Sequence, residues 1–231
     1  DLFPRCIAGR GSPPLDQVSS PQELADFADL FTPRYMVHRL AEMIDQGVAN
    51  PQLQLLSDEI DEYGAAWAEE LAAREQDALG PPLPRVLMHT TKGDIEIELF
   101  ENQAPETVAN FISLIESDFY VGRVFHRVIE HFMAQTGCSV GDGSGGPGYT
   151  IHGEADRPDA RKYFRGTLGM ALSGHPDSGG SQFFITFLPH PELNGQYTAF
   201  GRVTAGIDVL SDLVRVNPES EDEEKKKPAR M

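Results

Sequence analysis

The sequence predicts a mainly β fold, an antiparallel barrel with helices plugging its ends, preceded by a small α-helical N-terminal segment. From residue 83 onward the chain holds many short β-like runs separated by glycine-rich turns, which is typical of barrels. Two helical patterns interrupt these runs, and residues 1–82 show helical periodicity with an acidic composition. We therefore predict three regions, which are an acidic helical segment (1–82), a barrel domain (83–217) and a charged disordered tail (218–231).

The N-terminal segment contains three helical patterns after an irregular lead-in over residues 1–20. The capping-box sequence Ser20-Pro21-Gln22-Glu23 opens the first, and Thr32-Pro33 opens a second that stops at Gly47. Asn50-Pro51 opens the third, which Gly80-Pro81-Pro82 ends. The apolar stripes on these helices must be buried against another surface. We favour packing against other parts of this chain, and docking of another protein is the alternative.

The barrel pattern begins with a hairpin formed by residues 85–90 and 94–99 around the turn Lys92-Gly93. A helix opening at Pro105-Glu106 follows, with an apolar face that includes Phe111. Further strands are predicted over residues 123–129, 132–136, 166–172, 182–188 and 197–203. A closing helix is predicted over 206–216, with Val209, Leu210, Leu213 and Val214 facing inward.

Composition excludes several partner classes. The net charge of −17 argues against nucleic acid, whose phosphates need a basic surface, and no apolar run reaches the ~20 residues of a membrane span. Two cysteines, Cys6 and Cys138, are too few for a disulfide framework and are read as unpaired thiols. Because the chain starts at Asp1, a removed signal peptide would be invisible. We expect a soluble protein, with the compartment open between cytoplasm and export.

Common catalytic and metal motifs do not fit this sequence. The glycine-rich loop over 141–148 lacks the lysine and the following helix of a phosphate-binding loop, and is read as a tight turn. Ser181 lacks a nucleophile elbow. The spacing of His126, His131, Cys138 and His152 matches no structural zinc pattern. We expect neither a metal nor a cofactor.

The run over residues 125–135 carries the most chemical information. Alternation would place Phe125 and Arg127 on one face of a strand, and an apolar turn then leads to Gln135. A second amide, Gln182, stands beside aromatic residues further along the chain. An apolar pocket with a cation, amides and no nucleophile suits a substrate whose bonds are twisted and not cut.

Five motifs in order give the chain a resemblance to the cyclophilins over about residues 84–216. They are Phe125-His126-Arg127, Phe132-Met133-Ala134-Gln135, Gly143-Ser144-Gly145-Gly146, Gly180-Ser181-Gln182-Phe183-Phe184-Ile185 and Phe200-Gly201-Arg202-Val203. The resemblance implies an eight-stranded closed barrel with a helix at each end. It also implies peptidyl-prolyl cis-trans isomerase activity on proline-containing peptides and unfolded proteins.

The resemblance also assigns roles to individual residues. Arg127 matches the catalytic arginine, and Gln135 matches the amide that holds the substrate carbonyl. The remaining substrate-binding positions are Phe132, Met133, Gly143, Ala171, Leu172, Gln182, Phe184, Leu193 and Tyr197.

Several positions depart from the family pattern. Leu172 replaces asparagine, Tyr197 replaces histidine, and Thr136-Gly137-Cys138 replaces Gly-Gly-Asp. Glu192 stands at the position of the tryptophan that favours cyclosporin, so we expect weak cyclosporin binding. A proline-binding or chaperone module with weak catalysis and a partner-binding helical extension is the alternative function. Retained Arg127 and Gln135 favour the enzyme.

Overall fold

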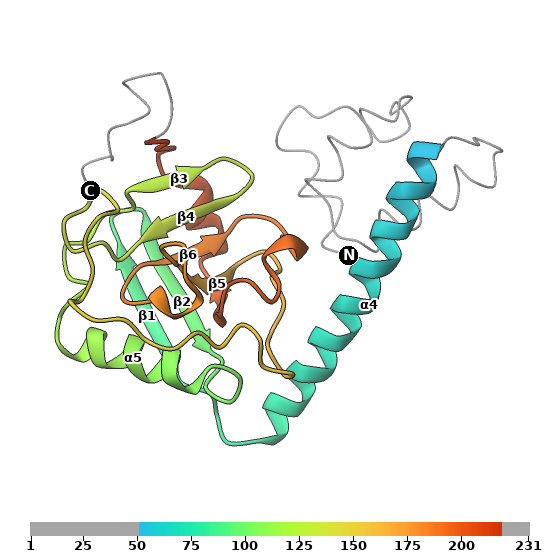
Figure 1. Ribbon diagram of the computed structural model, residues 1–231, viewed down its shortest axis with the longest axis horizontal. Coiled ribbons are helices and arrows are strands. Elements are labelled where there is room, and N and C mark those ends of the chain that lie inside the picture. Colours follow the sequence, from blue (N-terminus) through green and yellow to red (C-terminus); the bar gives the residue numbers. More distant parts are fainter. Residues whose placement is uncertain (1–50, 219–231) are drawn as a thin grey trace. The chain divides into compact units, whose positions relative to one another are not determined.

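The computed structural model describes residues 51–218 (Figure 1), with side-chain surroundings from Tyr63 onward. The chain divides into two compact units, residues 1–69 and residues 70–231, and each is described by itself. Helix α4 (Pro51–Leu79) is the third predicted helix; its last turns belong to the second unit and it ends before Gly80. The two earlier predicted helices, Cys6 and the predicted tail beyond Pro218 lie outside the described residues.

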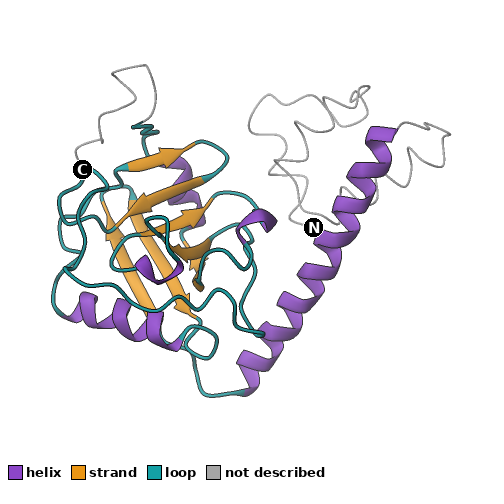
Figure 2. Cartoon of the chain, viewed as in Figure 1, coloured by secondary structure: helices purple, strands orange, loops and turns teal. Residues whose placement is uncertain are grey.

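Seven strands of the second unit form one sheet in the order β1-β2-β7-β5-β6-β4-β3, and all neighbours are antiparallel (Figures 1 and 2). The strands are β1 (Arg85–Thr90), β2 (Gly93–Leu99), β3 (Arg127–Ile129), β4 (Met133–Thr136), β5 (Thr167–Met170), β6 (Phe183–Thr186) and β7 (Ala199–Ala205). Each predicted strand therefore exists, although several are shorter than the sequence pattern indicates.

The sheet is an open half-barrel, which corrects the expected eight-stranded closed barrel. Strands β1 and β3 form its two edges and are not paired with each other. The chain returns to β3 through a single bridge between Val128 and Val216, where an eighth strand would be needed to close the sheet. The predicted strand over 123–129 begins only at Arg127, so the period-two alternation does not extend back to Phe125. Phe125 instead lies in the core.

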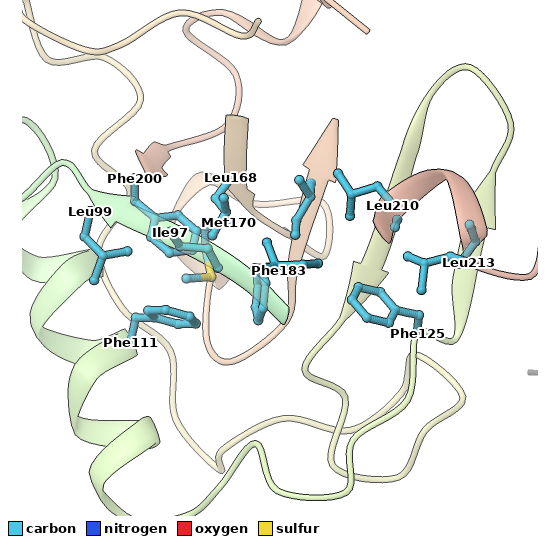
Figure 3. Packing of buried hydrophobic residues seen from close by; sticks show 14 of the residues in the cluster. Ile97, Leu99, Phe111, Phe125, Leu168, Met170, Phe183, Phe200, Leu210 and Leu213 are labelled. Atoms are coloured by element: carbon cyan, nitrogen blue, oxygen red, sulfur yellow. The ribbon is translucent and has the colours of Figure 1, made fainter. Parts of the chain in front are cut away.

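The core side chains of the central strands lie on one face of this sheet. Figure 3 shows Phe111 of α5 (Pro105–Glu116) at one side of the row of core side chains, with Leu210 and Leu213 at the other. The Phe111 ring meets the rings of Phe183 and Phe200 edge-on at 5.1 and 5.2 Å. Irregular registers in the β2–β7 and β5–β7 ladders are bulges, which increase the local twist of the sheet.

A distant carboxylate caps helix α5. Ala104 precedes the helix and offers no side-chain cap, whereas the buried Glu154 accepts hydrogen bonds from the backbone N–H groups of Glu106 and Thr107 at 3.1 and 2.9 Å. These N–H groups have no partner within a helix, and a negative charge also suits the helix N-terminus. The helix predicted from Pro105 is thus confirmed.

The predicted closing helix over 206–216 is shorter than expected. It is a 3-10 helix, η4 (Ile207–Asp212), that starts after a left-handed Gly206 and ends because Leu213 turns extended. Leu210 and Leu213 face the core as predicted, but Val214 is 49% exposed, which corrects its inward assignment. Two further 3-10 turns, η2 (Pro176–Ser178) and η3 (Pro191–Leu193), complete the described elements.

A buried ion cluster joins the last turns of α4 to the rest of the second unit. The Arg161 guanidinium donates to both oxygens of Glu70 at 2.8 Å and to Asp77 at 2.7 Å. It also lies over the Phe100 ring, 4.2 Å from the ring centroid. Glu70 and Arg161 are only 5% and 6% exposed, so each charge depends on the other for compensation.

Candidate active site

The register of strands β3, β4, β6 and β5 separates the two faces of the sheet. Val128, Ala134, Ile185 and Leu168 form one paired row, and all of them lie in the core. Arg127, Gln135, Phe184 and Gly169 form the adjacent row. Because side chains alternate along a strand, this second row points to the opposite face. The pairing therefore brings the two predicted catalytic residues, Arg127 and Gln135, side by side.

The Arg127 side chain is half-buried beside an aromatic ring. Its guanidinium carbon lies 6.0 Å from the centroid of the Phe132 ring. Within residues 51–218, Arg127 forms no ion pair, so no carboxylate of this part of the chain compensates its charge. A guanidinium stays protonated at any physiological pH and presents several donors in a rigid plane.

An apolar cluster covers the same face as Arg127 and Gln135. Its buried members are Met133, Tyr163, Phe184, Leu193 and Ala199, and its half-buried members are Ile129, Phe132, Ala171 and Tyr197. The Phe184 ring stacks on Tyr163 at 5.8 Å and meets the edge of Tyr197 at 5.6 Å. The predicted positions Phe132, Met133, Ala171, Phe184, Leu193 and Tyr197 are thus gathered in one place.

Gly169 makes this stacking possible. A Cβ atom at Gly169 would collide with the Tyr163 hydroxyl and the Phe184 ring, so both rings approach the strand because it carries no side chain. An isolated glycine within a strand pattern often marks such a close approach. Tyr163 belongs to no recognisable sequence motif, and Gly169 within a strand pattern is the one signal that a neighbouring side chain packs closely there.

A chain of amides runs from Gln135 to the glycine-rich loop. The Gln135 Nε2 donates to Gln182 Oε1 at 3.0 Å, and the Gln182 Nε2 donates to the carbonyls of Gly143 and Gly145, each at 2.8 Å. The Gln182 carbonyl accepts from the Ala171 N–H at 2.9 Å. The predicted residues Gln135, Gln182 and Gly143 therefore form one network. Leu172 belongs to neither group and lies near Gly179.

His126 lies beneath the loop and is 4% exposed. Neither of its ring nitrogens has a hydrogen-bond partner, and the position of a Gly143 Cβ would lie 3.5 Å from its Nε2. Burial lowers the pKa of His126, which favours the neutral ring. Among residues 51–218, no three His, Cys, Asp or Glu side chains gather as metal ligands, so His126, His131, Cys138 and His152 do not converge.

Two further residues complete this surface without having been predicted as site residues. The His190 ring meets the Phe132 ring edge-on at 4.8 Å, and its Nδ1 lies 2.7 Å from Glu192 Oε1. Glu192 thereby places an exposed carboxylate close to the apolar cluster.

In residues 51–218, no helix combines the length and the apolarity needed to cross a membrane.

A pocket of about 540 Å³ lies elsewhere, between the end of α4 and strands β1, β2 and β7. Its lining includes Arg85, Glu98 and Arg202, and Glu98 is hydrogen-bonded to both arginines at 3.1 and 2.6 Å. Arg85, Glu98 and Arg202 are therefore paired with one another, and none of the lining residues belongs to the predicted site.

Comparison with known proteins gives consistent results. The sequence model of the family described as cyclophilin type peptidyl-prolyl cis-trans isomerase matches residues 85–231. A peptidyl-prolyl cis-trans isomerase of Helicobacter pylori is 47% identical over 127 residues, which cover 54% of this chain and 76% of the relative. Peptidyl-prolyl cis-trans isomerase B of Bacillus subtilis is 49% identical over 119 residues, which cover 52% of this chain and 82% of the relative.

A solved structure shows the same likeness. It is a cyclophilin type peptidyl-prolyl cis-trans isomerase of Cryptosporidium parvum, crystallised in the presence of the dipeptide Ala-Pro. The TM-score is 0.55 at 35% identity, and the match covers 63% of this chain and 92% of that one.

Proposed function

We propose that Arg127 and Gln135 perform the reaction of this chain, which belongs to the cyclophilin type peptidyl-prolyl cis-trans isomerase family and is itself such an isomerase. The observation that carries the proposal is the register that sets Arg127 opposite Gln135 on the face bearing the apolar cluster. A cation, an amide and an apolar surface then stand together.

The reaction needs electrostatic help and no covalent step. Amide resonance makes rotation about an X–Pro bond slow, with a barrier of ~20 kcal/mol. In the twisted transition state the proline nitrogen is pyramidal and its lone pair is localised. A donor held near that nitrogen stabilises the twisted form more than either planar isomer, and only such a difference accelerates the reaction. Arg127 supplies a donor that cannot lose its charge.

The surrounding residues hold the rest of the peptide. We propose that the half-buried rings of Phe132 and Tyr197, over buried Met133, Phe184 and Leu193, receive the proline ring. Gln135 donates to the carbonyl before the proline, and Gln182, Gly143, Ala171 and Leu172 border the neighbouring residues. Each tenfold of rate needs ~1.4 kcal/mol of differential binding, so an acceleration of ~10⁵ needs ~7 kcal/mol. A few charge-assisted and apolar contacts supply that amount.

We also propose that the natural substrates are X–Pro bonds in unfolded or exposed segments of polypeptides, whose folding the enzyme assists. The C. parvum relative was crystallised with Ala-Pro, which is the chemical unit such a site would recognise.

Replacing Arg127 with alanine tests the assignment. We expect Arg127→Ala to lower the isomerisation rate of a proline peptide by ~10²-fold or more, as for other groups that stabilise transition-state charge. A protease-coupled assay measures this rate, and the same variants can be compared in the proline-limited refolding of a protein. Arg165→Ala, which removes an exposed arginine of the same unit, is the matched control and should leave the rate unchanged. Equal rates for Arg127→Ala and Arg165→Ala would reject the role.

A further inference from the structure

We infer that Cys138 is a positioning residue for the isomerase reaction, because its buried sulfur folds the loop over residues 138–145 so that the loop orients Gln182 and, through it, Gln135. The inference rests on the proposed role of Gln135 in holding the substrate. It adds a residue at which this chain departs from the family pattern, since Cys138 stands where Asp is usual.

The loop is wrapped around the Cys138 sulfur. This free cysteine is 1% exposed, and its Sγ accepts hydrogen bonds from the backbone N–H groups of Gly141, Gly143 and Gly145 at 3.1, 3.2 and 3.2 Å. Gly141 and Gly143 have φ near +90°, a left-handed conformation that lets successive N–H groups converge on one acceptor. Asp142, the carboxylate of this loop, accepts from the N–H and hydroxyl of Ser144 at 2.8 and 2.6 Å and from the Cys138 thiol at 3.9 Å.

The loop in turn fixes which way the two glutamine amides point. Both hydrogens of the Gln182 Nε2 are used by the carbonyls of Gly143 and Gly145, so its Oε1 must serve as an acceptor toward Gln135. The Gln135 Nε2 therefore points toward Gln182 and donates one of its two N–H groups to the Gln182 Oε1. The second N–H remains to donate to a substrate carbonyl. If the loop carbonyls moved, nothing in this chain of bonds would set the direction of the Gln135 amide.

A thiol at position 138 is an acceptor of suitable size and polarity. Burial raises the pKa of Cys138, but the backbone donors, led by Gly145 and Gly141, outweigh it and hold the pKa below its ordinary value. The loop N–H groups thus stabilise negative charge on the acceptor, as they would on an aspartate at this position. An apolar side chain at this position would leave three converging N–H groups without their common partner.

Substitution of Cys138 in the full chain tests the inference. We expect Cys138→Ala to lower kcat/KM about tenfold, the rate equivalent of one misdirected hydrogen bond. Cys138→Asp should stay within about threefold of the wild type, because a carboxylate also accepts from the loop. Ser144→Ala, an exposed change in the same loop, is the control and should have almost no effect. Cys138→Ser, whose oxygen lies closer to the backbone and reaches the three N–H groups less well, should fall between Ala and Asp, and it replaces Cys138→Ala if that variant does not fold.

A double-mutant cycle separates positioning from general stability. If Cys138 acts through Gln135, then Cys138→Ala should change kcat/KM by less than about twofold in the Gln135→Ala background. A folded Cys138→Ala with the wild-type rate would overturn the inference, as would a tenfold loss that persists in that background. A Gln135→Ala variant with the wild-type rate would instead reject the proposed function itself, so the two failures are distinguishable.

Discussion

The order of single residues along each strand determines which face of the sheet carries the candidate catalytic side chains and which face packs into the core. Strand alternation sends Val128 into the core and its neighbour Arg127 to the opposite face, where it meets Gln135. The sequence predicted both catalytic candidates through their motifs. It misplaced Phe125, because a pattern of period two cannot show that the strand starts two residues later, at Arg127. It also missed the stacking of Tyr163 on Phe184, since this contact joins residues distant in the chain.

Glu192 provides a test at the residue scale. We propose that its exposed carboxylate, 2.7 Å from His190 Nδ1, makes the rim of the apolar cluster unfavourable for a large apolar drug. Cyclosporin should therefore inhibit the wild type weakly, and Glu192→Trp should tighten inhibition by tenfold or more through added apolar contact. Inhibition constants from the peptide assay measure this, with Glu130→Trp as an exposed control. Nanomolar inhibition of the wild type would contradict the proposal.

Single elements show where propensity is overruled by packing. The third N-terminal helix and α5 both begin at the predicted proline, because proline at the first helical position is a local signal. The predicted closing helix shrinks to six residues, because its ends are set by contacts with the sheet and by the left-handed Gly206. A Cβ atom at Gly206 would collide with the Asp94 carbonyl, a constraint that no local pattern displays.

The end of α4 gives a pH-dependent prediction at the element scale. Burial raises the pKa of Glu70, but the hydrogen bonds and charges of Arg161 and Arg74 outweigh it, so the pKa lies below its ordinary value. A lowered pKa in the folded state stabilises the fold fully above the ordinary value, and this stability is lost as pH falls through the folded pKa. Urea unfolding of the wild type at a series of pH values from about 7 down to about 3 should show this loss.

Glu70→Gln identifies the source of that loss. It should reduce the free energy of unfolding by about 3 kcal/mol near neutral pH, because Arg161 is left buried without a full charge partner. It should also flatten the acid dependence. Glu75→Gln, an exposed change in the same helix, is the matched control and should preserve both stability and pH dependence. Identical unfolding curves for the two variants would show that the cluster contributes nothing.

At the scale of the whole molecule, the open half-barrel differs from the closed barrel that the resemblance implied. Strand number and closure depend on how two distant edges meet, and here the edge strands β1 and β3 do not pair, while β3 is reached only by a bridge from Val216 to Val128. Similarly, the sequence pattern changes from helical to β-like at residue 83, whereas the second compact unit starts at Glu70. Charge pairing across 91 residues, from Glu70 to Arg161, is not encoded in any local composition.

We propose that residues 70–82 function as part of the catalytic unit, which predicts different behaviour for two fragments. A fragment of residues 83–217 lacks Glu70 and Asp77, the carboxylates that pair with Arg161, so it should unfold with a lower free energy than a fragment of residues 70–218. Thermal and urea unfolding measure the difference, and equal stabilities would contradict the proposal.

The same fragments report on the N-terminal extension. Since no residue of α4 belongs to the proposed site, both fragments should match the kcat/KM of the full chain wherever they are folded. A faster fragment would mean that the preceding residues restrain the active face.

Substrate binding and rotation about the X–Pro bond can be measured separately in one sample. NMR exchange on an Ala-Pro peptide gives the cis–trans exchange rate at saturation, and titration gives the dissociation constant. If Arg127 acts on the twisted amide, Arg127→Ala should slow exchange by about 100-fold while the dissociation constant stays within about threefold. Unchanged exchange, or a loss confined to the dissociation constant, would contradict the account.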